Sequence, residues 1–220
     1  MSSHTAPKLG AHRPLVLASK KTLCKICSMK HDMTVSMTTI DESLAQLQLG
    51  ASKLLRPGLP AQTVTEELSA RGLRPGADLI ALYGWHDGTN SEPNVLLNDM
   101  YLMPGYYLLS LGEALETYDR FVNEYQENSS WLPLLEDNAG GYIFVDCSAT
   151  DRQPVYDFDF ENVENKLRHS SIQDMLATLA VAFTQGIFFK DEDGWFDMDS
   201  DAFWKLAARM NPTAQYWAED

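Results

Sequence analysis

Cysteine is scarce in this sequence of 220 residues, which contains three, and no run of apolar residues is long enough to cross a bilayer. Three cysteines cannot build the set of disulfide bridges that holds small secreted proteins together. A membrane-spanning helix needs about 20 consecutive apolar residues, and the run from Pro14 to Ser19 is too short even for the core of a signal peptide. We therefore expect no membrane insertion and a reducing, cytoplasmic location.

Basic residues are also few, because 17 lysines and arginines stand against 31 acidic residues, giving a formal charge of -14. Apolar residues make up 45% and charged residues 22% of the chain, as in ordinary globular proteins. A nucleic acid carries a dense line of negative phosphates, so a chain this acidic is poorly suited to binding it. We expect no nucleic-acid partner; a basic protein partner, or a simple need for solubility, fits the charge better.

The charge is unevenly distributed along the chain. Residues 1–36 contain six of the basic residues and a single acidic one, Asp32, so residues 37–220 carry a charge of -19. The segment 1–36 has no amphipathic period, and we predict that it lies outside the folded core. It is either a disordered tail, a transit-like segment or sequence upstream of a later true start, for which Met29, Met33 and Met37 are candidates and Met37 is favoured. Residues 37–220 are predicted to form a single domain with an acidic C-terminal helix.

Metal binding and cofactors are not expected from the sequence. Cys24 and Cys27 form a C-x-x-C with His31 nearby, but zinc needs about four ligands and no second pair is evident. Cys147 lies in an apolar run and is interpreted as a core residue. The acidic run that starts at Asp191 does not place glycine and glutamate where a calcium-binding EF-hand loop needs them.

Helix starts are marked by capping pairs, in which a Ser or Thr is followed three residues later by Glu or Gln. Apolar residues at helical spacing follow each pair. The predicted starts are Thr39, Thr63, Ser110 and Ser170, with further helices from near Pro75 to Tyr83 and from Ala202 to Met210, the last capped by Asp199 or Ser200. Gly72 and Gly186 are expected to end two of these helices.

Strand-like runs separate the helices. They cover 106–109, 131–135, 142–147, 155–160 and 187–189, and Pro133 confines its run to a sheet edge or a bulge. The mixture lacks a regular β-α-β alternation. We therefore predict an α+β fold, with helices packed on a largely antiparallel, twisted sheet of about five or six strands.

Two groups of residues are interpreted as structural. Trp85 and Gly88 are expected to end a helix and begin a turn, with the indole anchoring the helix to the sheet and the glycine adopting a backbone angle that a side chain resists. Gly140 and Gly141 precede the strand at Tyr142, so we interpret them as a turn and not as a phosphate-binding loop.

The order of several motifs resembles the SUKH superfamily, in particular the branch that contains the yeast cell-wall assembly regulator and bacterial toxin-immunity proteins. The resemblance covers roughly residues 57–188 and depends on the succession of motifs, since each is weak alone. The motifs are Leu59-Pro60, 80–89 (IALYGWHDGT), 107–114 (YLLSLGEA), 131–134 beginning at Trp131 (WLPL), 140–146 (GGYIFVD), 154–157 (PVYD) and 170–176 (SSIQDML).

This resemblance implies an α+β fold without a catalytic centre and a role in binding other proteins. Bacterial members resemble immunity proteins that neutralise toxins, whereas the fungal branch implies a signalling adaptor in cell-wall assembly. The sequence agrees with the implied lack of a catalytic centre, because it contains no G-x-S-x-G, H-E-x-x-H or P-loop motif. We therefore predict no catalytic residues, and we rank a hydrolase that uses two carboxylates last.

An acidic face would suit a toxin whose active-site surface is basic, because opposite potentials steer association. Asp157 and Asp159 are the strongest candidates, since strict alternation places both on one face of a strand. Any single acidic residue of the candidate face could instead serve solubility alone. We expect a monomer or a weak homodimer. The candidate partner-binding residues are Asp87, Glu92, Asp99, Asp157, Asp159, Asp191, Glu192 and Asp193.

Overall fold

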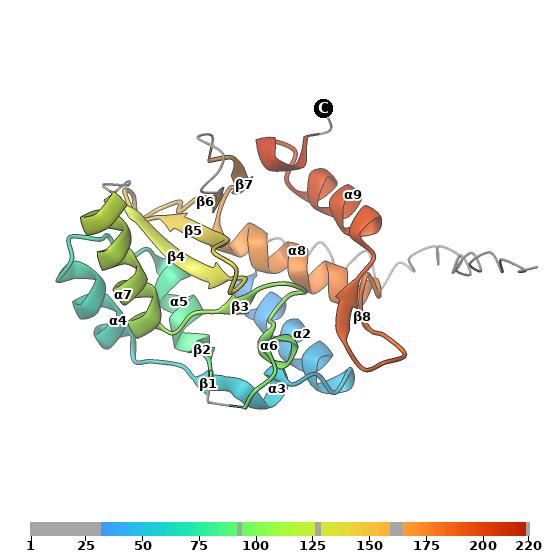
Figure 1. Cartoon of the computed structure of the whole chain (residues 1–220). Helices are drawn as coiled ribbons and strands as arrows, with labels where there is room; N and C mark the ends of the chain where they lie inside the picture. Colours follow the sequence, from blue (N-terminus) through green and yellow to red (C-terminus); the bar gives the residue numbers. More distant parts are fainter. Residues whose placement is uncertain (1–31, 92–93, 126–128, 159–164, 219–220) are drawn as a thin grey trace, which may run out of the picture.

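The computed structural model describes residues 32–91, 94–125, 129–158 and 165–218. These residues form an α+β fold, as predicted, in which helices pack against a five-stranded antiparallel sheet accompanied by two separate hairpins (Figure 1). Among these residues, no helix is of the length and apolar character that a bilayer crossing requires.

The central sheet has the strand order β3-β4-β5-β6-β7. Its strands are β3 (Tyr107–Leu108), β4 (Trp131–Glu136), β5 (Tyr142–Asp146), β6 (Val155–Phe158) and β7 (Leu167–His169). Pro133 lies in β4, which has a neighbour on each side, and the register shifts between Pro133 and Leu135. The expected bulge is thus confirmed, and the edge position is wrong, because the bulge lets an inner strand accommodate a residue without an N–H.

Two short hairpins lie outside the central sheet. One pairs β1 (Leu55–Pro57) with β2 (His86–Thr89), and the other pairs β8 (Phe188–Lys190) with β9 (Phe196–Met198). The first joins segments about 30 residues apart in sequence, whereas the second is local. Each adjoins a helix in the sequence, since β2 directly follows α5 (Ala77–Trp85) and β9 precedes α9 (Ser200–Met210).

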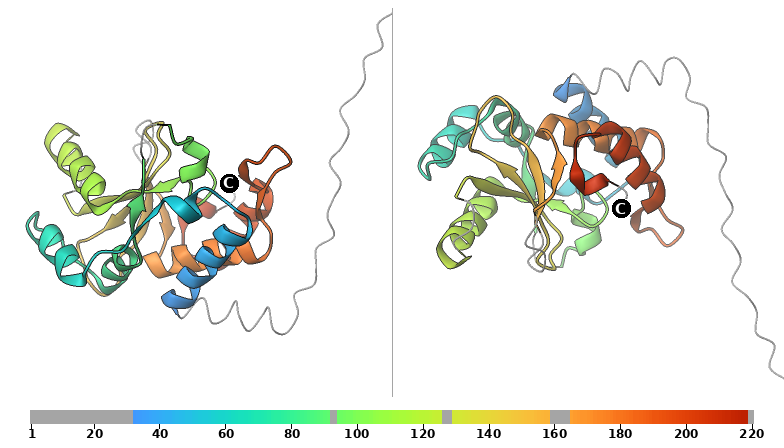
Figure 2. Two further views of the ribbon diagram at one scale, coloured as in Figure 1. Left: turned by 90° about the horizontal axis from the view of Figure 1, so that it is seen from below. Right: turned by 90° about the horizontal axis from the view of Figure 1, so that it is seen from above.

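The α-helices are α2 (Met33–Gln46), α3 (Ala51–Leu54), α4 (Ala61–Ser69), α5 (Ala77–Trp85), α6 (Leu97–Met100), α7 (Leu111–Arg120), α8 (Ile172–Thr184) and α9 (Ser200–Met210). A π-helical turn, η1 (Phe121–Tyr125), continues α7, and a 3-10 turn, η2 (Gln215–Trp217), follows α9. Figure 2 shows α7 on one side of the sheet and α5 and α8 on the other.

The sheet face toward α7 is aromatic. Phe121, directly after α7, makes edge-on contacts at about 5.4 Å between ring centroids with Tyr142, Phe144 and Phe158. Edge-to-face packing of this kind stabilises a core beyond the area it buries. In β6, Tyr156 and Phe158 pair with Phe144 and Tyr142 of β5, but burial along this strand does not alternate strictly, because both Val155 and Phe158 are buried.

The opposite side of the sheet is covered by α8, whose side chains from Met175 to Phe183 are all buried. The expected apolar stripe of this helix is confirmed, and Gly186 follows its end with a φ of +68°. The predicted start is wrong by one residue, because Ser171 is the N-cap and its Oγ accepts a hydrogen bond from the Asp174 amide at 3.0 Å. Ser170 lies just outside the helix.

The first described helix begins earlier than predicted. Asp32 caps α2, its carboxylate accepting from the Thr34 amide at 2.9 Å, and Ser36 is fully buried. Thr39, the predicted cap, is inside the helix, where its hydroxyl donates to the Val35 carbonyl at 2.8 Å. Residues 33–36 therefore belong to the helix and not to the N-terminal segment, and residues 1–31 lie outside the described part.

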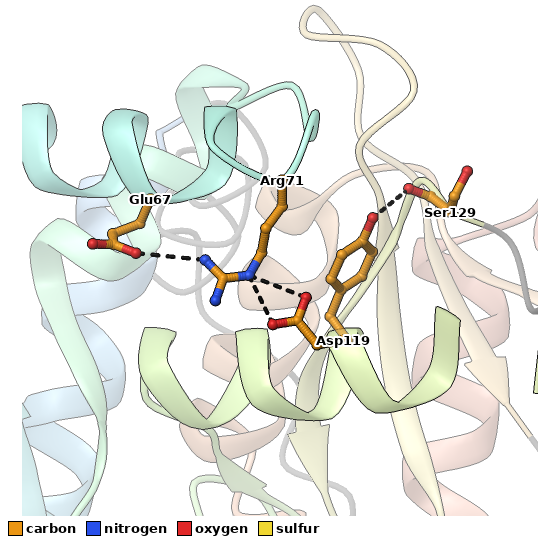
Figure 3. A network of polar contacts seen from close by, with 5 residues as sticks. Glu67, Arg71, Asp119 and Ser129 are labelled. Carbon is orange, nitrogen blue, oxygen red and sulfur yellow. Dashed lines mark hydrogen bonds and ion pairs between the residues drawn. The ribbon is translucent and has the colours of Figure 1, made fainter. Parts of the chain in front are cut away.

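A polar network connects the end of α4 to α7 (Figure 3). Arg71 Nε lies 3.2 and 3.1 Å from the two carboxylate oxygens of Asp119, and its terminal nitrogen lies 3.6 Å from Glu67. Beside them, the Tyr118 hydroxyl donates to the Ser129 carbonyl at 2.9 Å. Gly72 follows α4 with a φ of +75°, so its predicted role at the helix end is confirmed.

The outer edge of β7, which pairs with no further described strand, is covered by residues of η2. Trp217 Nε1 donates to the Arg168 carbonyl at 2.7 Å, and the Arg168 guanidinium lies 4.6 Å from the centre of the Tyr216 ring. The guanidinium also forms an ion pair with Asp157 on the neighbouring strand. Covering an edge strand in this way prevents it from pairing with another chain.

Candidate docking surface

The β8–β9 hairpin presents an exposed aromatic side chain among carboxylates. Asp191 closes the turn, because its carboxylate accepts from the Trp195 amide at 2.7 Å and its own amide donates to the Trp195 carbonyl at 2.9 Å. Glu192 and Asp193 are exposed at the tip. The Trp195 side chain is 50% exposed, which is unusual for a residue of this size.

The hairpin is fixed to the rest of the domain at three points. Asn98 in α6 hydrogen-bonds both the carbonyl and the amide of Phe196, at 3.0 and 2.9 Å. Lys190 donates to the Gln48 carbonyl, just after α2, at 3.1 Å. The buried Phe196 ring stacks on Phe183 of α8 at 5.7 Å between centroids. The tip therefore projects from a rigidly held base.

A groove of about 420 Å³ lies next to this base, between the α2–α3 connection and the segment that leads into α6. Leu96 lies in the same segment as the groove and is 59% exposed. The groove is lined by Gln48, Leu49, Gly50, Lys53, Leu54, Asn94, Val95 and Asp99. We call this groove together with Leu96 and residues 191–197 the hairpin–groove surface.

The predicted partner-binding residues divide into three sets. Four of them come together on the hairpin–groove surface: Asp99, Asp191, Glu192 and Asp193. Two others are engaged inside the domain, since Asp87 accepts from the Leu111 amide at 2.8 Å and Asp157 pairs with Arg168. Glu92 and Asp159 lie outside the described residues.

The contacts that Asp87 and Asp157 make inside the domain have physical explanations. Asp87 sits at the first turn of α7, where free amides attract a carboxylate, and Asp157 balances a cation that is only 5% exposed. Strand alternation predicted that Asp157 and Asp159 share one face, which stays a prediction because Asp159 lies outside the described residues. It did not predict that the next strand would supply Arg168, because the pairing of β6 with β7 is not visible in the pattern.

The glycines predicted to form turns and the predicted structural residue Trp131 are held in turns and in packing contacts. Gly88 has a φ of +73°, and a Cβ there would overlap the backbone of Ser110. Gly140 has a φ of +99°, and the Gly141 amide donates to Asp137 Oδ1 at 2.8 Å, which confirms the turn. Trp131 stacks on Tyr156 with centroids 4.6 Å apart.

The anchor formed by Trp85 differs from the expectation. Its Nε1 donates to Asp41 Oδ2 in α2 at 2.8 Å, so the indole joins two helices and its hydrogen bond does not reach the sheet. The adjacent His86 has Nε2 3.1 Å from the other Asp41 oxygen and Nδ1 2.9 Å from the Arg56 carbonyl. Sequence reasoning missed this cluster, because Asp41 is 44 residues away from Trp85.

Both ring nitrogens of His86 therefore lie within hydrogen-bond distance of an oxygen. The other histidine of the described part, His169, is fully buried, and burial lowers its pKa to about 3. Burial likewise raises the pKa of the Cys147 thiol to about 12, which keeps it protonated and a poor nucleophile.

Within residues 32–218 as described, no group of three or more His, Cys, Asp or Glu side chains could hold a metal ion. Tryptophan is enriched among the residues that contribute most to binding at protein interfaces, so the exposed indole makes this surface the candidate for docking. The sequence matches no protein-family model and no curated protein.

Proposed function

We propose that this chain is a non-enzymatic, SUKH-type immunity protein that binds a toxin with a basic active-site surface and covers that surface. Exposed Trp195 among the carboxylates of the hairpin is the observation that carries the proposal. The motif order of residues 57–188 supplies the link to toxin immunity, and the α+β fold is compatible with it. We place the protein in the cytoplasm, as a monomer or a weak homodimer.

The mechanism requires complementary shape and charge without a chemical step. Glu192, Asp193 and Asp197 are exposed, so their charge attracts a basic surface and raises the rate of association. On docking, the Trp195 indole loses its exposed area, and a side chain of the toxin enters the adjacent groove. Such a rigid, amphipathic anchor gains binding energy with little loss of conformational freedom.

The test is an affinity capture from the native host with the full chain. The wild-type protein is compared with Trp195→Ala and with a Glu192→Gln/Asp193→Asn double variant, and bound proteins are identified by mass spectrometry. The matched control is Glu116→Gln/Asp151→Asn, which removes the same charge from exposed positions on α7 and on the β5–β6 loop. Figure 1 shows α7 and β8 at opposite ends of the molecule.

We expect the wild type and the control to retain one partner, and Trp195→Ala to weaken it by at least about 30-fold, equivalent to about 2 kcal/mol. The purified partner should lose its toxic activity at a one-to-one ratio with the chain. Equal capture by all four proteins would contradict the proposed surface, and a bound partner that remains fully active would contradict toxin neutralisation.

An adaptor of cell-envelope assembly is the second candidate, and it is favoured by the basic N-terminal segment. An adaptor has to hold two proteins at once, so a second binding segment outside the domain suits it. Capture would then recover a partner whose activity is unchanged, together with another protein that is lost when the lysines of the segment are replaced.

A further inference from the structure

The hairpin–groove surface also fits a segment of this same chain. Residues 1–31 contain Lys8, Arg13, Lys20, Lys21, Lys25 and Lys30, and no acidic residue. The domain that follows carries a charge of -19 from residue 37 onward. Attraction between the two is therefore expected, and the question is where on the domain the segment lies.

Several carboxylates elsewhere are already engaged by side chains within the domain. Asp41 is bound by Trp85 and His86, Asp119 by Arg71, and Asp157 by Arg168. Glu192 and Asp193 make no such contact with the described residues. The nearby cations do not neutralise them, because Lys190 is held by the Gln48 carbonyl and Lys53 lines the groove.

The length of the segment determines which of its lysines can reach the tip. The hairpin lies beyond the end of α2 that is opposite Met33 (Figure 2), and the 14 residues of α2 span about 21 Å. Lys21 precedes Asp32 by eleven residues, which extend to about 40 Å at most. Lys30 is only two residues away, about 7 Å of chain, so it cannot reach.

We infer that residues 1–31 dock on the hairpin–groove surface of their own chain, with Lys20 and Lys21 against Glu192 and Asp193. The inference shares its surface with the proposed function but not the identity of the partner. A toxin would then compete with the segment for the surface. The tethered segment lowers the affinity of the surface for basic proteins in general, because the local concentration of the segment is high. Only a partner with better complementarity to the surface displaces the segment.

The test uses the full chain and a zero-length carbodiimide, which joins a lysine amine to a carboxylate with loss of water. Linked peptides are identified by mass spectrometry at low protein concentration. Mixing chains labelled with ¹⁴N and ¹⁵N separates links within one chain from links between two copies. The variants are Glu192→Gln/Asp193→Asn and the matched control Glu116→Gln/Asp151→Asn.

We expect links from Lys20 or Lys21 to Glu192 or Asp193 within single chains, and none from Lys30 to these two residues. In the hairpin variant, links from Lys20 and Lys21 to the remaining acidic residues of the hairpin should fall by at least about five-fold. The same loss should follow 0.5 M NaCl, where charges are screened within about 4 Å. The control variant should resemble the wild type.

Three results would overturn the inference. Links spread evenly over Glu116, Asp151 and the hairpin would show attraction without a site, links between differently labelled chains would show a second copy as the occupant, and an absence of links would show no docking. Each result leaves the proposed function standing if toxin capture still depends on Trp195. Loss of that dependence, with the links intact, would instead remove the proposed function alone.

Discussion

At the scale of single residues, Gly88 shows how a turn residue positions a helix. Its φ of +73° was anticipated by the sequence, but the close approach of its Cα to the backbone of Ser110 was not. This contact brings β2 against the start of α7, where Asp87 and the capping box of Ser110 with Glu113 satisfy the first amides. The glycine is thus required by space as well as by backbone angle.

Replacing Gly88 by alanine should lower the free energy of unfolding by about 3 kcal/mol or more, because strain and overlap with backbone act together. Gly105 provides the control, since its φ is +88° but no atom lies within 4 Å of an added Cβ. Gly105→Ala should lower stability by only about 1 to 2 kcal/mol. Urea denaturation measures both values, and equal losses would contradict the role of the close approach.

His169 is a buried titratable residue whose charge the fold excludes. Its Nδ1 lies 3.1 Å from Asn211 Oδ1, and desolvation, followed by the neighbouring Arg168 charge, lowers its pKa from 6.5 to about 3. The unfolded chain therefore binds a proton more readily than the folded protein. Stability from this residue is complete above pH 6.5 and is lost as the pH falls towards 3.

The wild-type free energy of unfolding should accordingly decrease between pH 6.5 and 4, with a contribution from His169 that approaches about 1.4 kcal/mol per pH unit. A His169→Gln variant lacks the titratable imidazole, so its free energy of unfolding should decline less steeply with acid. At pH 7.5 the variant should be less stable than the wild type. Denaturation curves at several pH values measure the difference between the two slopes. Parallel slopes would show that His169 titrates alike in the folded and unfolded states.

At the scale of elements, helix positions were predicted better than helix starts. The capping pair of Ser110 and Glu113 is real, with both reciprocal hydrogen bonds formed. The same pattern at Thr39 and Thr63 lies inside helices that begin at Met33 and Ala61. Threonine followed by glutamate at this spacing is compatible with a helix interior, because the hydroxyl can donate to the carbonyl four residues earlier.

Four of the short strands were not predicted. β1, β2, β7 and β9 have three or four residues each, and β2 continues directly from α5 without an intervening turn. Periodicity needs a longer run to distinguish a strand from a loop. These strands form because a distant partner is available, as when Leu55 pairs with Thr89.

The start of α2 depends on a residue that we first assigned to the N-terminal segment. Asp32→Ala removes the acceptor for the Thr34 and Val35 amides and should lower the free energy of unfolding by about 1 kcal/mol. Asp32→Asn is the control, since asparagine caps helices nearly as well. A chain that begins at Met37 should lose more, because the buried Ser36 goes with the first turn. Thermal unfolding midpoints of the wild type, the two Asp32 variants and the shortened chain measure these effects. Equal midpoints for all four proteins would contradict the role of the cap.

At the scale of the whole molecule, the sequence correctly predicted the fold class and an excess of acidic charge, but not which acidic residues remain free. The segments that carry Asp99 and Asp191 are joined because Asn98 hydrogen-bonds the backbone of Phe196 across almost 100 residues. The exposure of Trp195 is likewise set by tertiary packing, which buries its neighbour Phe196 and leaves the indole outside. A tryptophan within a run of acids was the one available signal.

The hairpin gives the molecule a built-in optical reporter. Trp217 is almost fully enclosed and Trp131 is stacked on Tyr156, whereas Trp195 is half open to water beside several carboxylates. Caesium ions, drawn by these carboxylates, should quench its emission more strongly than iodide, which they repel. Comparison with a Trp195→Phe protein isolates this one emission, so coverage of the hairpin becomes visible by fluorescence without any attached dye.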